Sequence, residues 1–490
     1  MLRQLLACKT SFNDEDDVNS PGLKRTLGPW GLIALGIGAV VGSGIFVITG
    51  LAAANFAGPA IILSFVIAAI CCTFTALCFA EFATLIPVSG SAYSYAYATL
   101  GELVAWFIGW NLVLEYGVSA SAVAVSWTGY FMSLLHHVGL DLPAVLVNAP
   151  LAFEHGRLVA TGAFFNLPAV ALVLALTALC YTGIRQSAGT NNAIVVLKVA
   201  LIILFIVVGW QYVDSANWKP FIPPVNAHGQ FGWSGVFHGA AIVFFAYIGF
   251  EATSVAAQEA RNPQRDLPIG ILLSLALCTV LYIAMAAVMT GLVPFSLLGT
   301  RDPVVTAIAA HPELGWLRGV VEVGILLGLS SVVLVMIIAQ PRIFMIMSRD
   351  GLLPKVFAKI HPRHHTPHIN TLITGFGIAL LAAIFPLDVL GDLVSMGTLI
   401  AFIAVCAGVL VLRYTQPDLP RTFRVPWIWI ISPLGVISCV FLLAQESGYN
   451  WMLMGLWTLL GLSIYFLYGH RHSQLHRASK ALPMEAEDRV

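Results

Sequence analysis

Charged residues are scarce in this sequence. Asp, Glu, Lys and Arg make up 10% of the 490 residues and hydrophobic residues 59%, whereas soluble proteins usually carry about 25% charged residues. A soluble protein of this length could not cover its surface with so few charges, so the chain must have the lipid bilayer as its main solvent. The 24 basic and 24 acidic residues cancel to a net charge of +0, which argues against a nucleic-acid partner.

Motifs of catalysis are also lacking. No HExxH, GxSxG or P-loop motif occurs, so nothing indicates a metalloprotease, a serine hydrolase or an ATPase. His364, His365 and His368 resemble metal ligands, but they lie in a basic loop without Cys or carboxylate partners and are interpreted as exposed histidines. We therefore expect no enzyme, no metal and no organic cofactor.

The cysteines do not follow the pattern of a disulfide framework. Of the eight cysteines, all but Cys8 fall within apolar runs and are interpreted as buried free thiols. The first residues contain an acidic stretch at 14–17 and lack the apolar segment of a signal peptide. Residues 1–25 are therefore predicted to form a cytoplasmic tail.

Twelve apolar runs are long enough to cross a bilayer, which takes about 20 residues per helix. They are residues 30–57, 60–86, 98–134, 163–183, 192–212, 233–258, 267–292, 318–346, 369–386, 391–412, 426–445 and 450–468. The run 98–134 is too long to lie entirely in the membrane. The sequence predicts an all-α integral membrane protein.

Lys and Arg residues orient these spans. With both termini in the cytoplasm, most basic residues of the loops lie inside, and only Arg157, Lys219, Arg301 and Arg318 lie outside. This distribution follows the positive-inside rule. We expect a multi-pass protein of the plasma membrane, of the bacterial inner-membrane type, with a second cytoplasmic tail at 469–490.

Glycines interrupt two of the spans. The first span contains four glycines between Gly36 and Gly44, and the sixth contains Gly249 followed by Glu251. Glycine weakens a helix by up to about 1 kcal/mol relative to Ala. Five spans separate the two interruptions, which is the arrangement of two inverted five-helix repeats that each open with a broken helix. Free backbone groups at such breaks bind the two ends of a zwitterion.

The residues at these breaks resemble known sequences. Residues 38–46 (GAVVGSGIF) are similar to the first-helix motif of the amino acid–polyamine–organocation superfamily. Residues 244–251 (FFAYIGFE), 259–268 (EARNPQRDLP) and 348–354 (SRDGLLP) are similar to its cationic amino acid transporter family, and the resemblance covers roughly residues 25–430. The family commonly has Asp where this chain has Glu251, which lengthens the side chain by one methylene group.

The resemblance implies a LeuT-like fold with a 5+5 inverted repeat and broken helices 1 and 6. The ten-helix core would span residues 26–412, with repeats at about 26–212 and 233–412, and two additional helices would follow at 413–468. Members carry amino acids across membranes, and bacterial members are often proton-coupled. The proton is then the coupling ion, and the partners are an L-amino acid and the lipid bilayer. An accessory subunit or a bound lipid is left open.

The resemblance also places the substrate between the two breaks. Its carboxylate would meet Ser43 and the N–H of Gly44, and its ammonium would meet carbonyl groups of Val40, Phe245, Ala246 and Ile248. Leu329 and Ser330 on the eighth helix would line the side-chain end of the pocket. Helix packing alone would also explain a serine such as Ser43, bonded to its own backbone.

Lys198 is the most informative single residue, because it interrupts the apolar run 193–202. A charged lysine in a membrane helix costs about 2.5–3.5 kcal/mol on insertion scales. It either snorkels to the cytoplasmic surface or serves as a titrating amine. The resemblance implies the second role, since Lys198 matches the proton-site lysine of proton-coupled members. We therefore expect coupling to H⁺ rather than Na⁺.

Other charges and aromatic residues add weaker expectations. Glu115 and Glu251 lie deep in spans, where they could bind a cationic side chain, relay protons or pair with Lys198. Glu322, nearer an interface, is expected to be solvated. Aromatic residues form a series that suits an interfacial belt: Tyr93, Tyr95, Tyr97, Trp106 and Trp110.

The function that follows is secondary active transport of a cationic or small neutral L-amino acid, probably the commonest use of such a site. Two acids favour arginine or lysine, whereas bulky residues on the eighth helix favour alanine-sized substrates. An uncoupled facilitator or exchanger and a transporter-like amino acid sensor are the alternatives.

Overall fold

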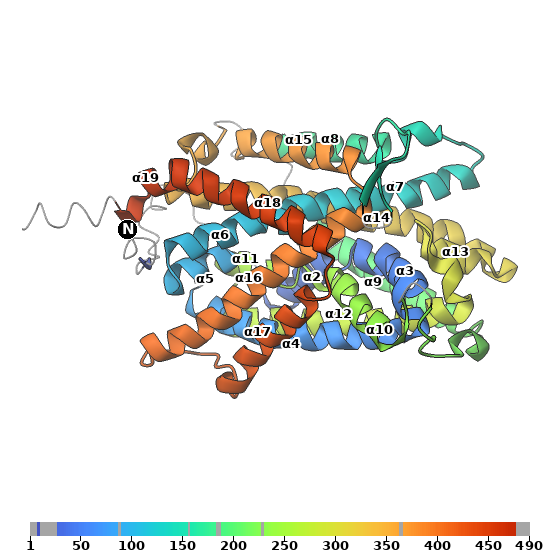
Figure 1. The fold of residues 1–490 in the computed structure, drawn as a ribbon, viewed down its shortest axis with the longest axis horizontal. Helices are drawn as coiled ribbons and strands as arrows, with labels where there is room; N and C mark the ends of the chain where they lie inside the picture. The colour runs from blue at the N-terminus through green and yellow to red at the C-terminus, as the bar shows by residue number, and fades with distance from the viewer. Residues whose placement is uncertain are drawn as a thin grey trace, which may run out of the picture.

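The computed structural model describes residues 7–9, 27–86, 90–154, 157–182, 188–226, 230–361 and 366–476. The predicted tails therefore lie largely outside the described residues, as do His364 and His365. Helices make up most of the described chain (Figure 1). A two-stranded antiparallel hairpin, β1 (Leu151–Glu154) and β2 (Arg157–Ala160), lies between α7 (Ser119–His137) and α8 (Leu167–Tyr181). The all-α prediction misses this hairpin.

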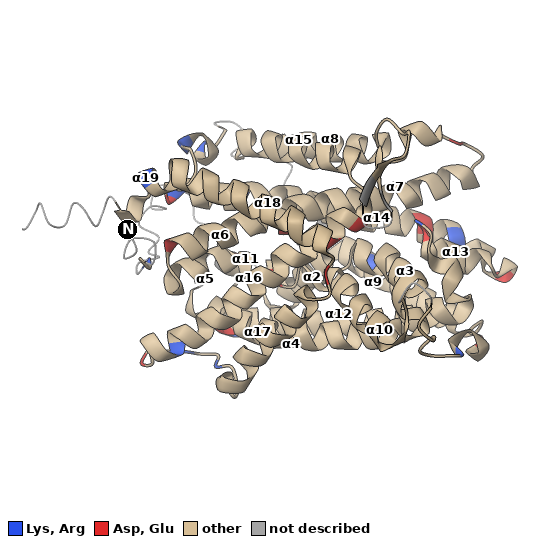
Figure 2. Cartoon of the chain, viewed as in Figure 1, with Lys and Arg blue, Asp and Glu red and all other residues tan. Residues whose placement is uncertain are grey.

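Apolar helices dominate the structure, as predicted. Within the described ranges, 8 helical segments are long and apolar enough to cross a membrane: Gly44–Leu85, Glu102–His137, Asn192–Trp210, Gly232–Val255, Pro263–Leu292, Pro312–Arg349, Leu387–Thr415 and Gly448–His476. Shorter apolar helices are α2 (Pro29–Val40), α8, α15 (His368–Ile384) and α17 (Ile428–Leu443). Charged residues lie mostly toward the two ends of the molecule (Figure 2). The chain is a multi-pass membrane protein.

Two groups of helices face each other across the broken spans. The first group consists of α2, α4 (Ile61–Leu85), α10 (Gly232–Phe244) and α12 (Pro263–Leu292), which contact one another. The second consists of α7, α8, α14 (Gly315–Arg349) and α15. Helix α9 (Ala188–Trp210) contacts both α2 and α14, so it joins the groups.

The remaining elements extend or connect these groups. Long helices at the end of the chain are α16 (Leu387–Thr415), α17 and α18 (Gly448–Ile464). Shorter helices are α3 (Thr49–Ala52), α5 (Ser91–Thr99), α6 (Glu102–Val113), α11 (Ala252–Val255), α13 (Pro303–Ala309) and α19 (His470–His472). Helix α6 continues through the π-helical turn Leu114–Val118 into α7, so the predicted long span 98–134 begins in helix only at Glu102.

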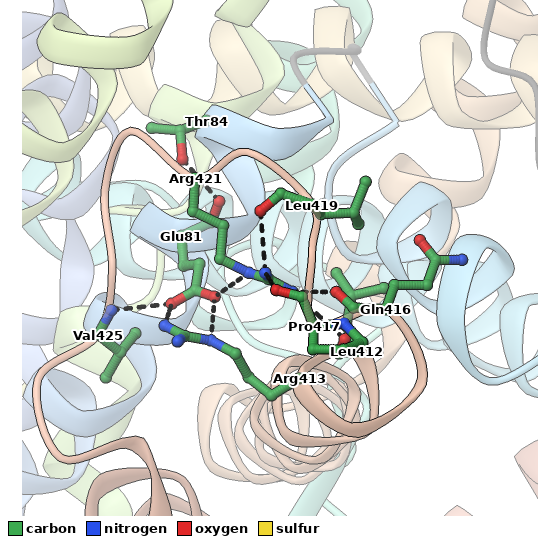
Figure 3. Close-up of polar contacts among 9 residues, drawn as sticks. All are labelled: Glu81, Thr84, Leu412, Arg413, Gln416, Pro417, Leu419, Arg421 and Val425. Carbon is green, nitrogen blue, oxygen red and sulfur yellow. Dashed lines mark hydrogen bonds and ion pairs between the residues drawn. The ribbon is translucent and has the colours of Figure 1, made fainter.

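A buried carboxylate fastens the end of α4 to the loop after α16 (Figure 3). Glu81 accepts hydrogen bonds from Arg413 Nε (2.9 Å) and Nη2 (2.7 Å) and from the Val425 backbone N–H (2.8 Å). Arg421 Nε lies 3.2 Å from the same carboxylate, and its other nitrogens donate to backbone carbonyls of the loop. Because both charges are paired and hydrogen-bonded, their burial is tolerated.

The expected aromatic belt is wrong for most of its members. Tyr93, Tyr95, Tyr97 and Trp106 are at most 1% exposed. Their polar atoms find partners inside the protein: Tyr93 donates to Asp350 (2.7 Å) and Trp106 to the Gly461 carbonyl (2.9 Å). A buried aromatic residue with a bonded polar atom packs as core, so these rings join helices rather than anchor them at the membrane surface.

Glu322 and the cysteines test two further predictions. Glu322 is fully buried rather than solvated, because Ser133 (2.8 Å), Arg318 (3.0 Å) and His137 (3.2 Å) satisfy its carboxylate. The seven cysteines of the apolar runs are buried free thiols, as expected.

Candidate functional site

The first span is interrupted where the sequence predicts. Helix α2 ends at Val40, and Val41 has an extended backbone with φ −75° and ψ 94°. Helical structure resumes as the π-helical turn Gly44–Ile48. A break of this kind exposes carbonyl groups at the end of one half-helix and N–H groups at the start of the other.

The span that begins with α10 is interrupted as well. A 3₁₀ turn (Phe245–Tyr247) follows α10, and Ile248 is extended with φ −62° and ψ 131°. Gly249 has a φ of 122°, which glycine adopts without steric cost. Helix resumes at Ala252 as α11. Both predicted interruptions are therefore present.

Glycines bring the two breaks into direct contact. A Cβ added to Gly44 would overlap the backbone of Ala246, and one added to Gly249 would lie 2.8 Å from the carbonyl carbon of Ala39. Only a residue without a side chain permits such an approach. The free backbone groups of the two spans are thus gathered in one place.

A small cavity of about 10 Å³ lies between the breaks and two neighbouring helices. It is lined by Ala39, Val40, Gly42, Ser43, Gly44, Ser119, Val123, Phe245, Ile248, Val332 and Met336. This volume suits about one water molecule, so the structure shows the space in a closed form. Most of the lining side chains are apolar, and the serines supply the hydroxyl groups.

Ser43 contributes an unused hydroxyl group to this cavity. The residue is buried, and its Oγ has no hydrogen-bond partner within the described part of the chain. The alternative of a packing serine bonded to its own backbone is therefore not what the structure shows. An unsatisfied buried hydroxyl costs about 1–3 kcal/mol, which a bound carboxylate would relieve.

Lys198 reaches the first break from α9. Its Nζ donates to the carbonyls of Gly38 (3.0 Å) and Val41 (3.2 Å), and the residue is 1% exposed. The side chain therefore does not snorkel to the surface. Its methylene groups lie against Gly328 of α14, where an added Cβ would be 3.3 Å from Lys198 Cε. One amine thus connects α2, α9 and α14.

The carbonyl of Val40 is partly engaged. Tyr282 of α12 donates its hydroxyl to this oxygen at 2.9 Å. A carbonyl oxygen has two lone pairs, so one acceptor position remains for another donor. The contact holds the end of α2 against α12.

Glu115 and Glu251 face each other beside the breaks. Their carboxyl groups are close enough to interact as a pair, and the Gly249 N–H donates to Glu251 Oε2 at 3.0 Å. Oε1 of each residue lacks a partner among the described residues. Two neighbouring carboxylates resist being ionised together, so the pair favours holding one proton or a cation.

Comparison with known proteins decides the family. Residues 27–460 match the family model described as amino acid permease. The chain belongs to the amino acid permease family. It is a transport protein and not an enzyme.

The relatives of this permease include bacterial and eukaryotic proteins. It is 46% identical to the branched-chain amino acid permease BcaP of Bacillus subtilis, covering 93% of this chain and 95% of the relative. It is 45% identical to the methylthioribose transporter of the same organism, over 94% of this chain and 96% of that protein. Human cationic amino acid transporter 4 is 34% identical over 83% of this chain and 63% of its own length.

The permease brings some predicted residues together and leaves others apart. Val40, Ser43, Gly44, Phe245 and Ile248 line the cavity, and Ala246 touches Gly44. The lining residues described by the structure do not include Leu329 or Ser330.

The eighth span contributes other residues than those predicted. Leu329 is buried, and the Ser330 hydroxyl donates to the Leu326 carbonyl of its own helix (2.7 Å). Val332 and Met336 line the cavity instead. They lie three and seven positions after Leu329, so they share its helix face one and two turns further along.

Ser119 and Val123 are the other lining residues that sequence reasoning missed. Ser119 lies four positions after Glu115, and helical spacing places it on the same face. That spacing is the signal that would have found it.

Proposed function

We propose that this permease is a proton-coupled secondary active transporter of a neutral aliphatic L-amino acid. The observation that carries the proposal is the Lys198 amine, buried and bonded to the carbonyls of the first break beside the cavity. A proton on this amine can stabilise one conformation over another, as coupling requires.

The cavity favours the neutral of the two substrate classes predicted from the sequence. Val123, Val332, Met336, Phe245 and Ile248 present apolar atoms around it, and apolar lining binds apolar side chains. The relatives named for branched-chain amino acids and methylthioribose agree with an apolar or thioether substrate. A cationic side chain would instead have to reach Glu115 or Glu251.

The substrate's polar ends would bind at the breaks. Ser43 Oγ and the N–H of Gly44 would take the carboxylate, while carbonyls of Val40, Phe245, Ala246 and Ile248 would take the ammonium. Backbone groups at helix breaks can bind a zwitterion without a fully charged side chain.

Lys198 would act through the helix to which it binds. A protonated amine is attracted to the carbonyl end of α2, where the helix dipole is negative. Protonation would therefore hold α2, α9 and α14 together, and loss of the proton on the cytoplasmic side would let them separate. Glu115, paired with Glu251, is the second proton-binding candidate.

The architecture supports alternating access. Family membership implies a LeuT-like fold, in which the group α2, α4, α10 and α12 rocks against the group α7, α8, α14 and α15. We place both termini in the cytoplasm and the protein in a bacterial plasma membrane, on the distribution of basic residues.

The test is uptake by protein reconstituted in liposomes, with labelled leucine, methionine, alanine and arginine. An inward H⁺ gradient is crossed with an inward Na⁺ gradient. Leucine or methionine accumulated under the H⁺ gradient alone supports the proposal. Preference for arginine would contradict the substrate class, a requirement for Na⁺ would contradict the coupling, and uptake unaffected by either gradient would support a facilitator.

A further inference from the structure

Three helices place one polar side chain each beside the cavity. They are Glu115 in the turn after α6, Glu251 at the start of α11 and Gln340 on α14, and all are at most 1% exposed. Oε1 of both glutamates and both amide atoms of Gln340 have no hydrogen-bond partner in the described chain. Nothing in the sequence analysis singles out Gln340.

Helical spacing places two of these residues just beyond the cavity. Glu115 precedes Ser119 by four positions, and Gln340 follows Met336 by four positions, while Ser119 and Met336 line the cavity. Residues four apart share a face and lie about one turn, or ~5.4 Å, from each other along the axis. With both termini in the cytoplasm, each step leads toward the cytoplasmic side.

The Gln340 amide lies against the turn that carries Glu115. A Cβ added to Gly117 would be 3.8 Å from Gln340 Oε1, so the absence of a side chain at Gly117 leaves space beside the amide. Pro341 follows Gln340 within α14, and proline interrupts helical hydrogen bonding and bends a helix. The amide therefore sits at a point where α14 can change direction.

An amide buried without partners is costly and rare. An apolar residue such as Met or Leu would fill this position without that cost, as Met336 does one turn away. The same helix face thus changes from apolar at the cavity to polar beyond it. Such a change suits a place that receives a polar ligand in another conformation.

We propose that Glu115, Glu251 and Gln340 form a second substrate station, on the cytoplasmic side of the cavity. There the two carboxyl groups receive the ammonium of the departing amino acid, and the Gln340 amide N–H donates to its carboxylate. The station deepens the proposed function and rests on it, because it assumes a zwitterionic substrate that leaves toward the cytoplasm.

Sidedness gives the test. Gln340→Met removes both polar atoms with little change in volume, and Gln445→Met makes the same replacement at a half-buried glutamine whose amide donates only to the Phe441 carbonyl among printed contacts of the described chain. Exchange of leucine is measured in right-side-out and inside-out vesicles, so that half-saturation is obtained separately for each face. Thermal melting of the purified variants reports folding.

We expect Gln340→Met to raise the half-saturating leucine concentration about tenfold at the cytoplasmic face and less than twofold at the outer face. Gln340→Glu keeps an acceptor but removes the donor, and it should show the same one-sided weakening. Gln445→Met should match wild type at both faces.

Equal effects at the two faces, or none, would overturn the second station. If Gln340→Met does not fold, the Gln340→Glu result alone decides in the same way. The proposed function fails separately, if the wild-type protein shows no coupled amino acid uptake at all.

Discussion

Replacing Lys198 by Met should uncouple the permease from the proton. The substitution keeps most of the side-chain length but removes the amine that donates to Gly38 (3.0 Å) and Val41 (3.2 Å). Hydrogen bonds from a charged donor contribute about 1.5–3 kcal/mol each. At the lower end, the two bonds together amount to about 3 kcal/mol, which is a ~100-fold shift in a two-state equilibrium.

The assay is leucine uptake into liposomes at external pH values between 5.5 and 8. Wild-type uptake should fall as the pH rises, because fewer molecules carry the proton at Lys198. The variant should accumulate no leucine above the external concentration, and its uptake rate should not change with pH. Lys219→Met, at an exposed lysine of a loop, is the matched control and should behave as wild type.

A Lys198→Met variant that retains the wild-type pH profile would refute the reasoning. Retained accumulation with a shifted profile would point instead to the Glu115 and Glu251 pair as the coupling group. Thermal melting of the variant separates loss of coupling from loss of folding.

Three further predictions concern other parts of the molecule. Gly44→Ala should abolish uptake and lower stability by about 1–3 kcal/mol, since its methyl group would overlap the Ala246 backbone; uptake and thermal melting check both. Glu81→Gln should lower stability by about 3 kcal/mol or more, because it leaves buried arginines unpaired, and normal melting would contradict this. Burial, and then the charge of Asp392, raise the pKa of Glu446, in the loop before α18, to about 8. A raised carboxyl pKa means that stability falls as pH rises from about 4.5 through 8, so Glu446→Gln should melt above wild type at pH 9, with the difference shrinking toward pH 5.

The fold was largely predictable because bilayer physics constrains it strongly. Each apolar run from residue 30 to residue 468 contains helix in the structure, since backbone groups in lipid must bond within their own segment. The breaks were predictable too, because glycines and a carboxylate at mid-span oppose a continuous helix. The β1–β2 hairpin was not, since it lies outside the bilayer, where hydropathy gives no signal.

Helix rotation and long-range pairing limited the prediction of the site. Leu329 lies on the face that lines the cavity but one turn from it, because no local signal fixes the depth of a residue on α14. The partners of Glu322 come from α7 and from its own helix, and only folding brings the first of these within reach. A sequence therefore marks a buried charge as unusual without naming what neutralises it.

Substrate choice depends on the depth at which charge is placed. The cavity itself is lined by aliphatic, aromatic and thioether side chains and by two serines, and the paired carboxyl groups of Glu115 and Glu251 lie beyond it. Because an isolated charge beside apolar atoms is costly, a neutral side chain is favoured where the substrate first binds. A cationic side chain would have to extend past that region to reach the acids. Replacing Met336 by a small residue should therefore broaden the permease toward larger or cationic substrates, measured as the ratio of arginine to leucine uptake, and an unchanged ratio would show that the lining of α14 does not set the choice.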